Sequence, residues 1–212
     1  MPSFVDLLAE RPVLLADGAT GTNYQNMGIE PGVAPEEWVV DAPEKVQELH
    51  RRFIEAGSDL VLTCSFGGSS LRLADEALHG RAVEVNRRAA ELAREAVGDD
   101  VLVAGSLGPT GHLTEPLGPL THDLAVATFA EQARSLTDGG VDLLVLETFF
   151  SLDEGLWAVE GIKSASDLQV GFESMQCMWR GQRLSPRSGN ASCRSIRKYT
   201  LSSRWAKRRS TS

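Results

Sequence analysis

The sequence has few cysteines and few aromatic residues, and it contains no long apolar run. Its three cysteines, Cys64, Cys177 and Cys193, are too few and too widely spaced for a disulfide framework or a CxxC metal motif. No apolar stretch approaches the roughly 18 residues that a membrane span needs, and the opening MPSFVDLLAERP lacks the order of a signal peptide. These absences predict a cytoplasmic globular protein that does not span a membrane.

Acidic residues are missing from the last part of the chain. Residues 1–173 hold all 29 Asp and Glu against 11 Lys and Arg, a net charge of −18, whereas residues 174–212 hold ten basic residues and carry +10. This second segment is rich in Ser and Arg and shows no apolar periodicity. We therefore divide the chain into a globular part, residues 1–173, and a basic tail, residues 174–212, which we expect to be out of frame or disordered.

Nucleotide-binding motifs are also absent, because no GxGxxG follows the first apolar run and no GxxxxGK occurs. Short apolar runs alternate with segments of helical periodicity, which span residues 43–57, 81–98, 121–140 and 151–164. We expect buried parallel strands at residues 13–16, 60–63, 101–105, 143–147 and 169–172. Nearly five βα units fit either a doubly wound sheet or a (β/α)8 barrel. The missing motifs favour the α/β barrel, truncated after about five units and followed by the irregular basic tail.

Local signals delimit the helices and reveal one internal similarity. Ser151 followed three residues later by Glu154 predicts a capping box at the start of the last helical segment. The stretch AGSDLVLTCSF, residues 56–66, aligns without gaps on GGVDLLVLETF, residues 139–149, so that Gly57 matches Gly140 and Asp59 matches Asp142. We expect the same sequence of helix end, strand and loop at both places.

Polar residues cluster where the predicted strands end, and both candidate architectures build their sites at this edge. Two carboxylates beside small hydroxyls suit a zwitterionic ligand, with the acids on its ammonium group and the hydroxyls and loop amides on its carboxylate. Asp17 before a glycine is also typical of a plain turn, and Cys64 of a buried apolar position. The candidate site residues are Asp17, Gly18, Thr63, Ser65, Ser106 and Glu147.

Several motifs in order resemble the homocysteine S-methyltransferase family. They are DGATGT from Asp17, PEKVQELHRRFIEAGSDLVLTCSF, NRRAAELAREA, GSLGPTG and FAEQARSLTDGGVDLLVLETF, and the resemblance runs from about Val13 to Phe172. It implies a (β/α)8 barrel that binds homocysteine at its C-terminal mouth and transfers a methyl group to the thiol, giving methionine. By resemblance, Asp17 and Glu147 hold the substrate ammonium group. Gly18, Thr63 and Ser106 are similar to residues that line the amino-acid end, and Ser65 is a weaker candidate.

The resemblance also implies a Zn²⁺ ion held by three cysteines, which deprotonates the homocysteine thiol. In the family these cysteines follow the sixth strand, after an Asn, and the eighth strand, as a Cys-Cys pair. Neither context occurs in this chain, so we assign no metal ligand to Cys177 or Cys193 and no catalytic residue. We expect the chain as written to be inactive. The resemblance also allows cobalamin- or folate-binding modules, which would lie outside the barrel.

Two alternatives stay open. The basic tail, with its arginines and Trp179, Tyr199 and Trp205, could bind nucleic acid or another anionic partner, which would make the chain a binding protein. A segment rich in Ser and Arg is more often disordered than it is a binding surface, so we regard nucleic-acid binding as the less favoured prediction. A different small-molecule enzyme could also share only the barrel scaffold.

Overall fold

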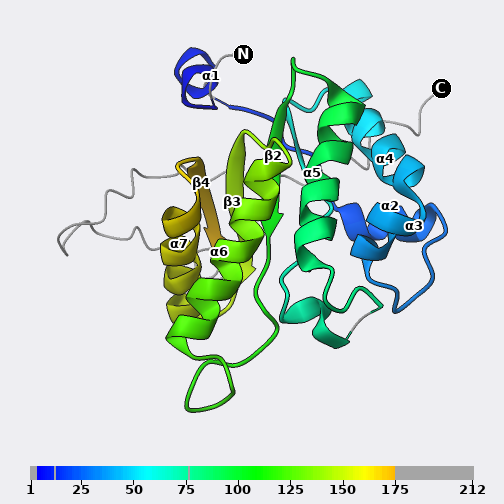
Figure 1. The fold of residues 1–212 in the computed structure, drawn as a ribbon. Helices are drawn as coiled ribbons and strands as arrows, with labels where there is room; N and C mark the ends of the chain where they lie inside the picture. The colour runs from blue at the N-terminus through cyan, green and yellow to red at the C-terminus, as the bar shows by residue number, and fades with distance from the viewer. Residues whose placement is uncertain (1–3, 12, 76, 175–212) are drawn as a thin grey trace.

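The computed structural model describes residues 4–11, 13–75 and 77–174, with a parallel sheet at its centre (Figure 1). The sheet has four strands in the order β1-β2-β3-β4, and every neighbouring pair is parallel. The strands are β1 Leu60–Leu62, β2 Leu102–Leu107, β3 Leu143–Phe149 and β4 Gln169–Ser174. Apart from Ser174, the basic tail with Cys177 and Cys193 lies outside the described residues.

Four amphipathic helices confirm the four predicted helical segments. They are α4 Pro43–Glu55, α5 Ala82–Val97, α6 His122–Asp138 and α7 Leu152–Ala165. Each buries one apolar stripe, as the sequence periodicity predicts. The shorter elements are α1 Phe4–Glu10, α2 Thr20–Asn26, α3 Trp38–Asp41 and two 3-10 helices, Pro35–Glu37 and Arg72–Asp75.

The helices α5, α6 and α7 cover one face of the sheet (Figure 1). On that face Phe129 and Ile162 pack in one cluster with Val103 and Leu144 of the strands. The first residues of β1, β2 and β3 instead form a separate cluster with apolar residues of α1. Strands in strict sequential order, with their connecting helices on one side, form the wall of a (β/α) barrel. A doubly wound sheet would reverse its strand order and place helices on both faces.

The predicted strand at residues 13–16 forms only one parallel bridge, between Ala16 and Leu60. The backbone oxygen of Leu15 accepts from the N–H groups of Asp59 and Leu60, at 2.7 and 3.3 Å. The N–H of Leu15, however, donates to the Asp59 carboxylate at 2.8 Å and to no backbone oxygen. A side chain thus takes the place of a ladder bond, and the segment lies beside β1 as an extended chain. The described sheet therefore has four strands where the sequence predicted five.

The internal similarity corresponds to a structural device that occurs twice. Gly57 and Gly140, with φ of 99° and 90°, end the turns before β1 and β3, and this conformation favours glycine. Asp59 then binds the N–H of Leu15, and Asp142 binds the N–H of Val103 at 2.7 Å. In each case an arginine pairs with the same aspartate, Arg11 with Asp59 and Arg94 with Asp142. Each aspartate therefore joins the start of its own strand to the preceding extended segment.

The capping box predicted at α7 is only half present. The Ser151 hydroxyl accepts from the N–H of Glu154 at 3.3 Å, as expected for an N-cap. The Glu154 side chain does not return to Ser151. It is buried, and its Oε1 accepts from both the N–H and the hydroxyl of Thr110, each at 2.8 Å. The Glu154 carboxylate therefore accepts from two buried donors outside the helix and does not cap the helix N-terminus.

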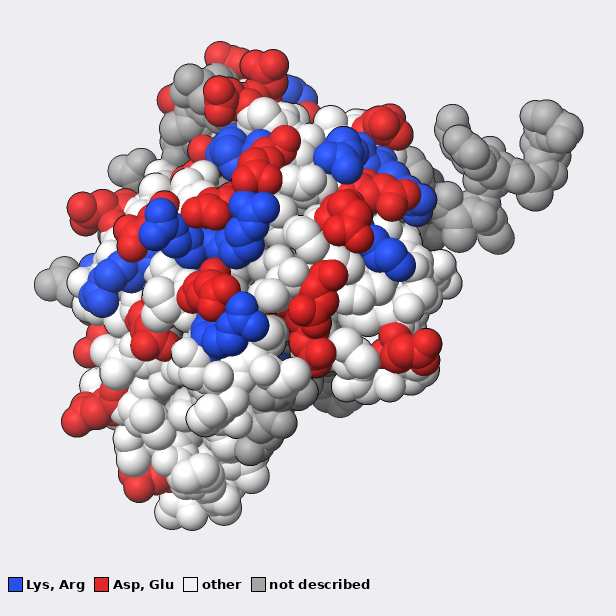
Figure 2. Space-filling model, turned by 45° about the vertical axis from the view of Figure 1, so that its right-hand side comes forward, with Lys and Arg blue, Asp and Glu red and all other residues white. Residues whose placement is uncertain are grey.

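Charges of both signs lie close together on one face of the molecule. Figure 2 shows Lys and Arg intermixed with Asp and Glu on the face it views. Ion pairs within single helices join Arg52 to Glu48 on α4 and Arg87 to Glu91 on α5. Among the described residues, no helix combines the length and the apolar character that crossing a membrane requires.

Candidate substrate site at the carboxyl ends of the strands

Asp17 lies where the extended first segment ends beside β1. Its N–H donates to the backbone oxygen of Leu60 at 3.1 Å, and its Oδ2 accepts from the N–H of Leu62 at 3.0 Å. The side chain is buried. One bond holds the backbone and the other the carboxyl group of Asp17 against β1, so Asp17 is more than an exposed turn residue.

The environment of Asp17 disfavours its charged form. The pKa of this carboxyl is raised from 3.8 to about 8, mainly by burial and in smaller part by the negative charge of Glu147, against the lowering effect of the Leu62 N–H. Two carboxyl groups therefore share one region, and one of them holds its proton near neutral pH. A cation placed between them would favour ionisation of both.

Glu147 and Ser106 meet across adjacent strands. The hydroxyl of Ser106, on β2, donates to Oε1 of Glu147, on β3. Glu147 precedes Thr148, which has a φ of 61°, and the pairing of β3 with β4 shifts register between Leu146 and Phe149. A β-branched residue rarely adopts this conformation. The backbone of β3 is therefore irregular next to Glu147, the residue that carries the carboxylate.

Thr63 and Ser65 enclose the backbone of Ser106 in a ring of hydrogen bonds. The Ser106 N–H donates to Thr63 Oγ1 at 3.0 Å, and the Ser65 hydroxyl donates to the Ser106 oxygen at 2.8 Å. The two hydroxyl oxygens are 2.6 Å apart. Since a serine hydroxyl has one proton, Thr63 must donate in this last contact. Both hydroxyl protons are thus used within the protein, and neither remains for a ligand.

The structure brings together most of the predicted site residues. Thr63 and Ser65 contact Ser106, and Ser106 contacts Glu147. Asp17 is coupled electrostatically to Glu147 and is bonded to the residue before Thr63. Gly18 follows Asp17 into an exposed loop ahead of α2, and a Cβ there would make only ordinary contact with Phe53, so steric crowding does not require glycine.

Four buried polar residues that the sequence analysis did not single out as site residues support these loops. Glu36 accepts from the N–H of Gly67 at 2.6 Å, Glu154 holds Thr110, and the side chains of Asn86 and Gln132 reach the loop after β1. Asn86 and Gln132 interrupt the apolar stripes of α5 and α6. Asn86 and Gln132 could have been identified from the sequence as polar residues within apolar stripes, because such a residue must find a hydrogen-bond partner inside the protein.

Among the described residues, no group of three His, Cys, Asp or Glu side chains is arranged to hold a metal ion. Cys64 is buried and its Sγ donates to the Pro35 oxygen at 3.4 Å. Burial, together with the charge of Glu36, raises the pKa of the Cys64 thiol and so favours the neutral form, which is a poor ligand. The described residues therefore do not fit a zinc site.

Comparison with known proteins agrees with the family resemblance found in the sequence. A family model described as homocysteine S-methyltransferase matches residues 14–198, which extends beyond Phe172. The homocysteine methyltransferase MmuM from Escherichia coli matches over 79% of this chain in its metallated, oxidized and apo forms, at 24%, 24% and 25% identity and TM-scores of 0.69, 0.70 and 0.62. The chain spans 64%, 63% and 61% of the length of those structures.

Proposed function

Because the chain belongs to the homocysteine S-methyltransferase family, we propose that the carboxyl ends of its strands bind homocysteine as the acceptor of a methyl group. The contact between Ser106 and Glu147, with buried Asp17 coupled to the same carboxylate, is the observation that carries this proposal. The methyl donor would bind at the same mouth in a complete barrel. Its chemistry is not encoded in the described residues.

The two acids account for recognition of an ammonium group. A homocysteine ammonium ion between Asp17 and Glu147 would offset the burial and the repulsion by Glu147 that raise the Asp17 pKa, and it would leave both carboxylates charged. Binding would therefore release a proton from Asp17 near neutral pH. Ser106, by donating to Glu147 Oε1, fixes where that carboxylate meets the ligand.

The remaining candidates divide into two roles. The backbone N–H groups of Gly18 and Ala19 lie in the exposed loop beside Asp17, where they could donate hydrogen bonds to the ligand carboxylate. Thr63 and Ser65 have committed their hydroxyl protons to the ring around Ser106. We assign these two residues to support of Ser106, and Gly18 to the ligand.

Methyl transfer needs a thiolate, and the resemblance to the family implies a zinc ion that would supply it. The described residues do not fit such an ion, so no step of the transfer is assigned to it here. We propose that the 212-residue chain binds homocysteine at the mouth without converting it. Homocysteine binding and methionine formation are therefore tested by separate measurements.

Calorimetric titration with L-homocysteine tests the binding site. Glu147→Ala should weaken binding by about 1.5 to 3 kcal/mol, the range for a hydrogen bond to a charged group. Glu44→Ala, which removes an exposed glutamate from the first turn of α4, is the matched control and should leave the affinity unchanged. The deamino analogue of homocysteine should bind weakly to the wild type and lose little further with Glu147→Ala. Equal affinity of the wild type and Glu147→Ala for homocysteine would remove Glu147 from the site.

A further inference from the structure

Two side chains in the helical layer reach through to the loop that follows β1. Gln132, on α6, donates from Nε2 to the backbone oxygen of Ser65 at 2.9 Å and to Asn86 Oδ1 at 3.1 Å. Asn86, on α5, donates from Nδ2 to the backbone oxygens of Gly68 at 2.6 Å and of Ala82 at 2.7 Å. Both residues are almost fully buried, with 0% of Asn86 and 2% of Gln132 exposed, and their donors bond to protein oxygens.

The loop is packed directly against these amides. A Cβ on Gly68 would come within 2.6 Å of Asn86 Oδ1 and 3.0 Å of the Ser65 oxygen, so the absence of a side chain is what allows the approach. Ser65 and Gly68 are also joined by a backbone bond of 2.9 Å. The two amides therefore hold a closed turn at both of its ends.

This turn contains the residues that hold Ser106. The carbonyl of Ser65 is held by Gln132, while its hydroxyl is held on the Ser106 oxygen and contacts Thr63. A chain of hydrogen bonds thus runs from α5 and α6 through Ser65 to Ser106, and from Ser106 to Glu147. Each link is buried or partly buried, where breaking a hydrogen bond leaves a costly unpaired polar group, although Gln132 Oε1 accepts no hydrogen bond within the described part of the chain.

We propose that Gln132 and Asn86 are positioning residues for homocysteine, which set the loop after β1 and, through the ring formed by Thr63 and Ser65, the Ser106 hydroxyl on Glu147. The ligand named here rests on the proposed function, but the positioning itself is a property of the free protein. The site is thereby fixed from the helical layer, through the side chains of α5 and α6 that bond to the loop after β1.

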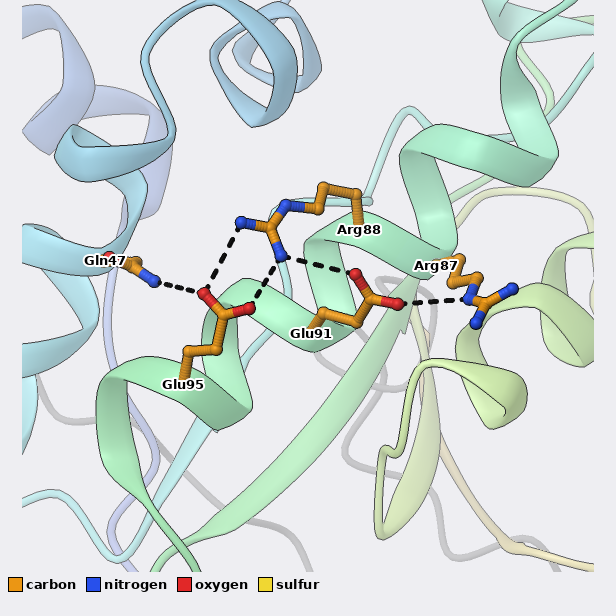
Figure 3. Close-up of polar contacts among 5 residues, drawn as sticks. All are labelled: Gln47, Arg87, Arg88, Glu91 and Glu95. Atoms are coloured by element: carbon orange, nitrogen blue, oxygen red, sulfur yellow. Dashed lines mark hydrogen bonds and ion pairs between the residues drawn. The ribbon is translucent and has the colours of Figure 1, made fainter.

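Gln132→Met tests the first link, because it keeps the length of the side chain and removes its donors. Backbone amide exchange should accelerate about tenfold or more at Gly68 and Ser106, while β3 amides such as Val145 stay at the wild-type rate. Homocysteine affinity should fall about tenfold. Gln47→Met is the matched control, since Gln47 also joins α5 to a neighbouring helix, through an exposed hydrogen bond to Glu95 at 2.7 Å (Figure 3).

Thr63→Val and Thr63→Ser test the second link and remain informative if Gln132→Met fails to fold. Valine keeps the shape and removes the hydroxyl, so the Ser106 amide should exchange faster, whereas serine keeps the hydroxyl and should restore the protection. Exchange at Gly68 and Ser106 that matches the wild type in folded Gln132→Met and Thr63→Val would overturn the proposal. If the wild type binds no homocysteine while these amides respond as expected, the positioning stands and the proposed ligand fails.

Discussion

Asp17 shows how a single residue is set by its surroundings. The carboxyl group is buried at the end of the extended first segment and bonded to the Leu62 N–H. Burial raises its pKa from 3.8 to about 8. Between these values the folded protein holds a proton that the unfolded chain has released. The contribution of Asp17 to the free energy of unfolding therefore falls as pH rises through this window.

Asp17→Asn should remove that dependence while keeping an oxygen that can accept from Leu62. The variant should gain stability over the wild type as pH rises from about 4 to about 8, by up to about 1.4 kcal/mol per pH unit. Urea unfolding at several pH values measures the difference. His50, whose pKa is lowered to about 4 by burial, titrates equally in both proteins and cancels. Exposed Asp99→Asn is the control, and parallel curves for Asp17→Asn and wild type would refute the raised pKa.

At the scale of elements, the loops at the mouth are held by helices that lie beside them. The first turn of α7 supplies Glu154, whose Oε1 accepts two hydrogen bonds from Thr110 in the loop after β2. Helices α5 and α6 supply Asn86 and Gln132 to the loop after β1. The loop after β1 is thus tied both to α5, the helix it leads into, and to α6, while the loop after β2 is tied to α7. This ties neighbouring units together where the sheet ends.

Replacing Glu154 separates this tie from the helix cap. Glu154→Ala should lower the free energy of unfolding by about 2 to 4 kcal/mol, because it leaves the buried N–H and hydroxyl of Thr110 without an acceptor. Glu154→Gln keeps the Oε1 acceptor and should cost under about 1 kcal/mol. Asp153→Ala, in the same first turn, controls for the lost charge near the helix N-terminus. Denaturant titration decides, and an equal loss for all three variants would mean that only the helix end matters.

At the scale of the whole molecule, the described residues form a barrel wall with two open edges. The edge beside β1 carries only the single bridge of Ala16, and β4 pairs with β3 alone among the described residues. A closed barrel pairs its last strand with its first, which removes both edges. The chain spans under two thirds of the MmuM structures it resembles. The mouth of the described part is therefore lined from one side.

We predict that the 212-residue chain neither retains stoichiometric zinc nor forms methionine. A catalytic zinc site takes three protein ligands in a tetrahedral arrangement, and Cys64 is held neutral and buried beside Pro35. Cys177 and Cys193 are carried by a segment of strongly basic composition. Metal content after dialysis, and methionine formation from homocysteine with each of several methyl donors, measure the two claims. Stoichiometric zinc with turnover would contradict both and would make Cys177 and Cys193 candidate ligands.

The sequence alone determined the elements and the edge of the sheet on which the candidate residues lie. Apolar periodicity and turn residues act within a few positions, so β1 to β4 and α4 to α7 were predictable, and Glu147 and Ser106 followed from being at strand ends. The family resemblance was equally readable, and the family model confirms it.

Only the tertiary structure decided which polar groups bind one another. Ser106 and Glu147 are 41 positions apart, and Gln132 and Ser65 are 67 apart. The local sequence did not indicate that the Glu154 side chain would accept from Thr110 and not cap its own helix. Nor did it indicate that Asp59 would accept from the Leu15 N–H, so that the first segment lacks a complete ladder of backbone hydrogen bonds. The physical reason is the same in each case. A buried polar group takes the partner that the packed chain brings to it, and that partner is set by the folded topology.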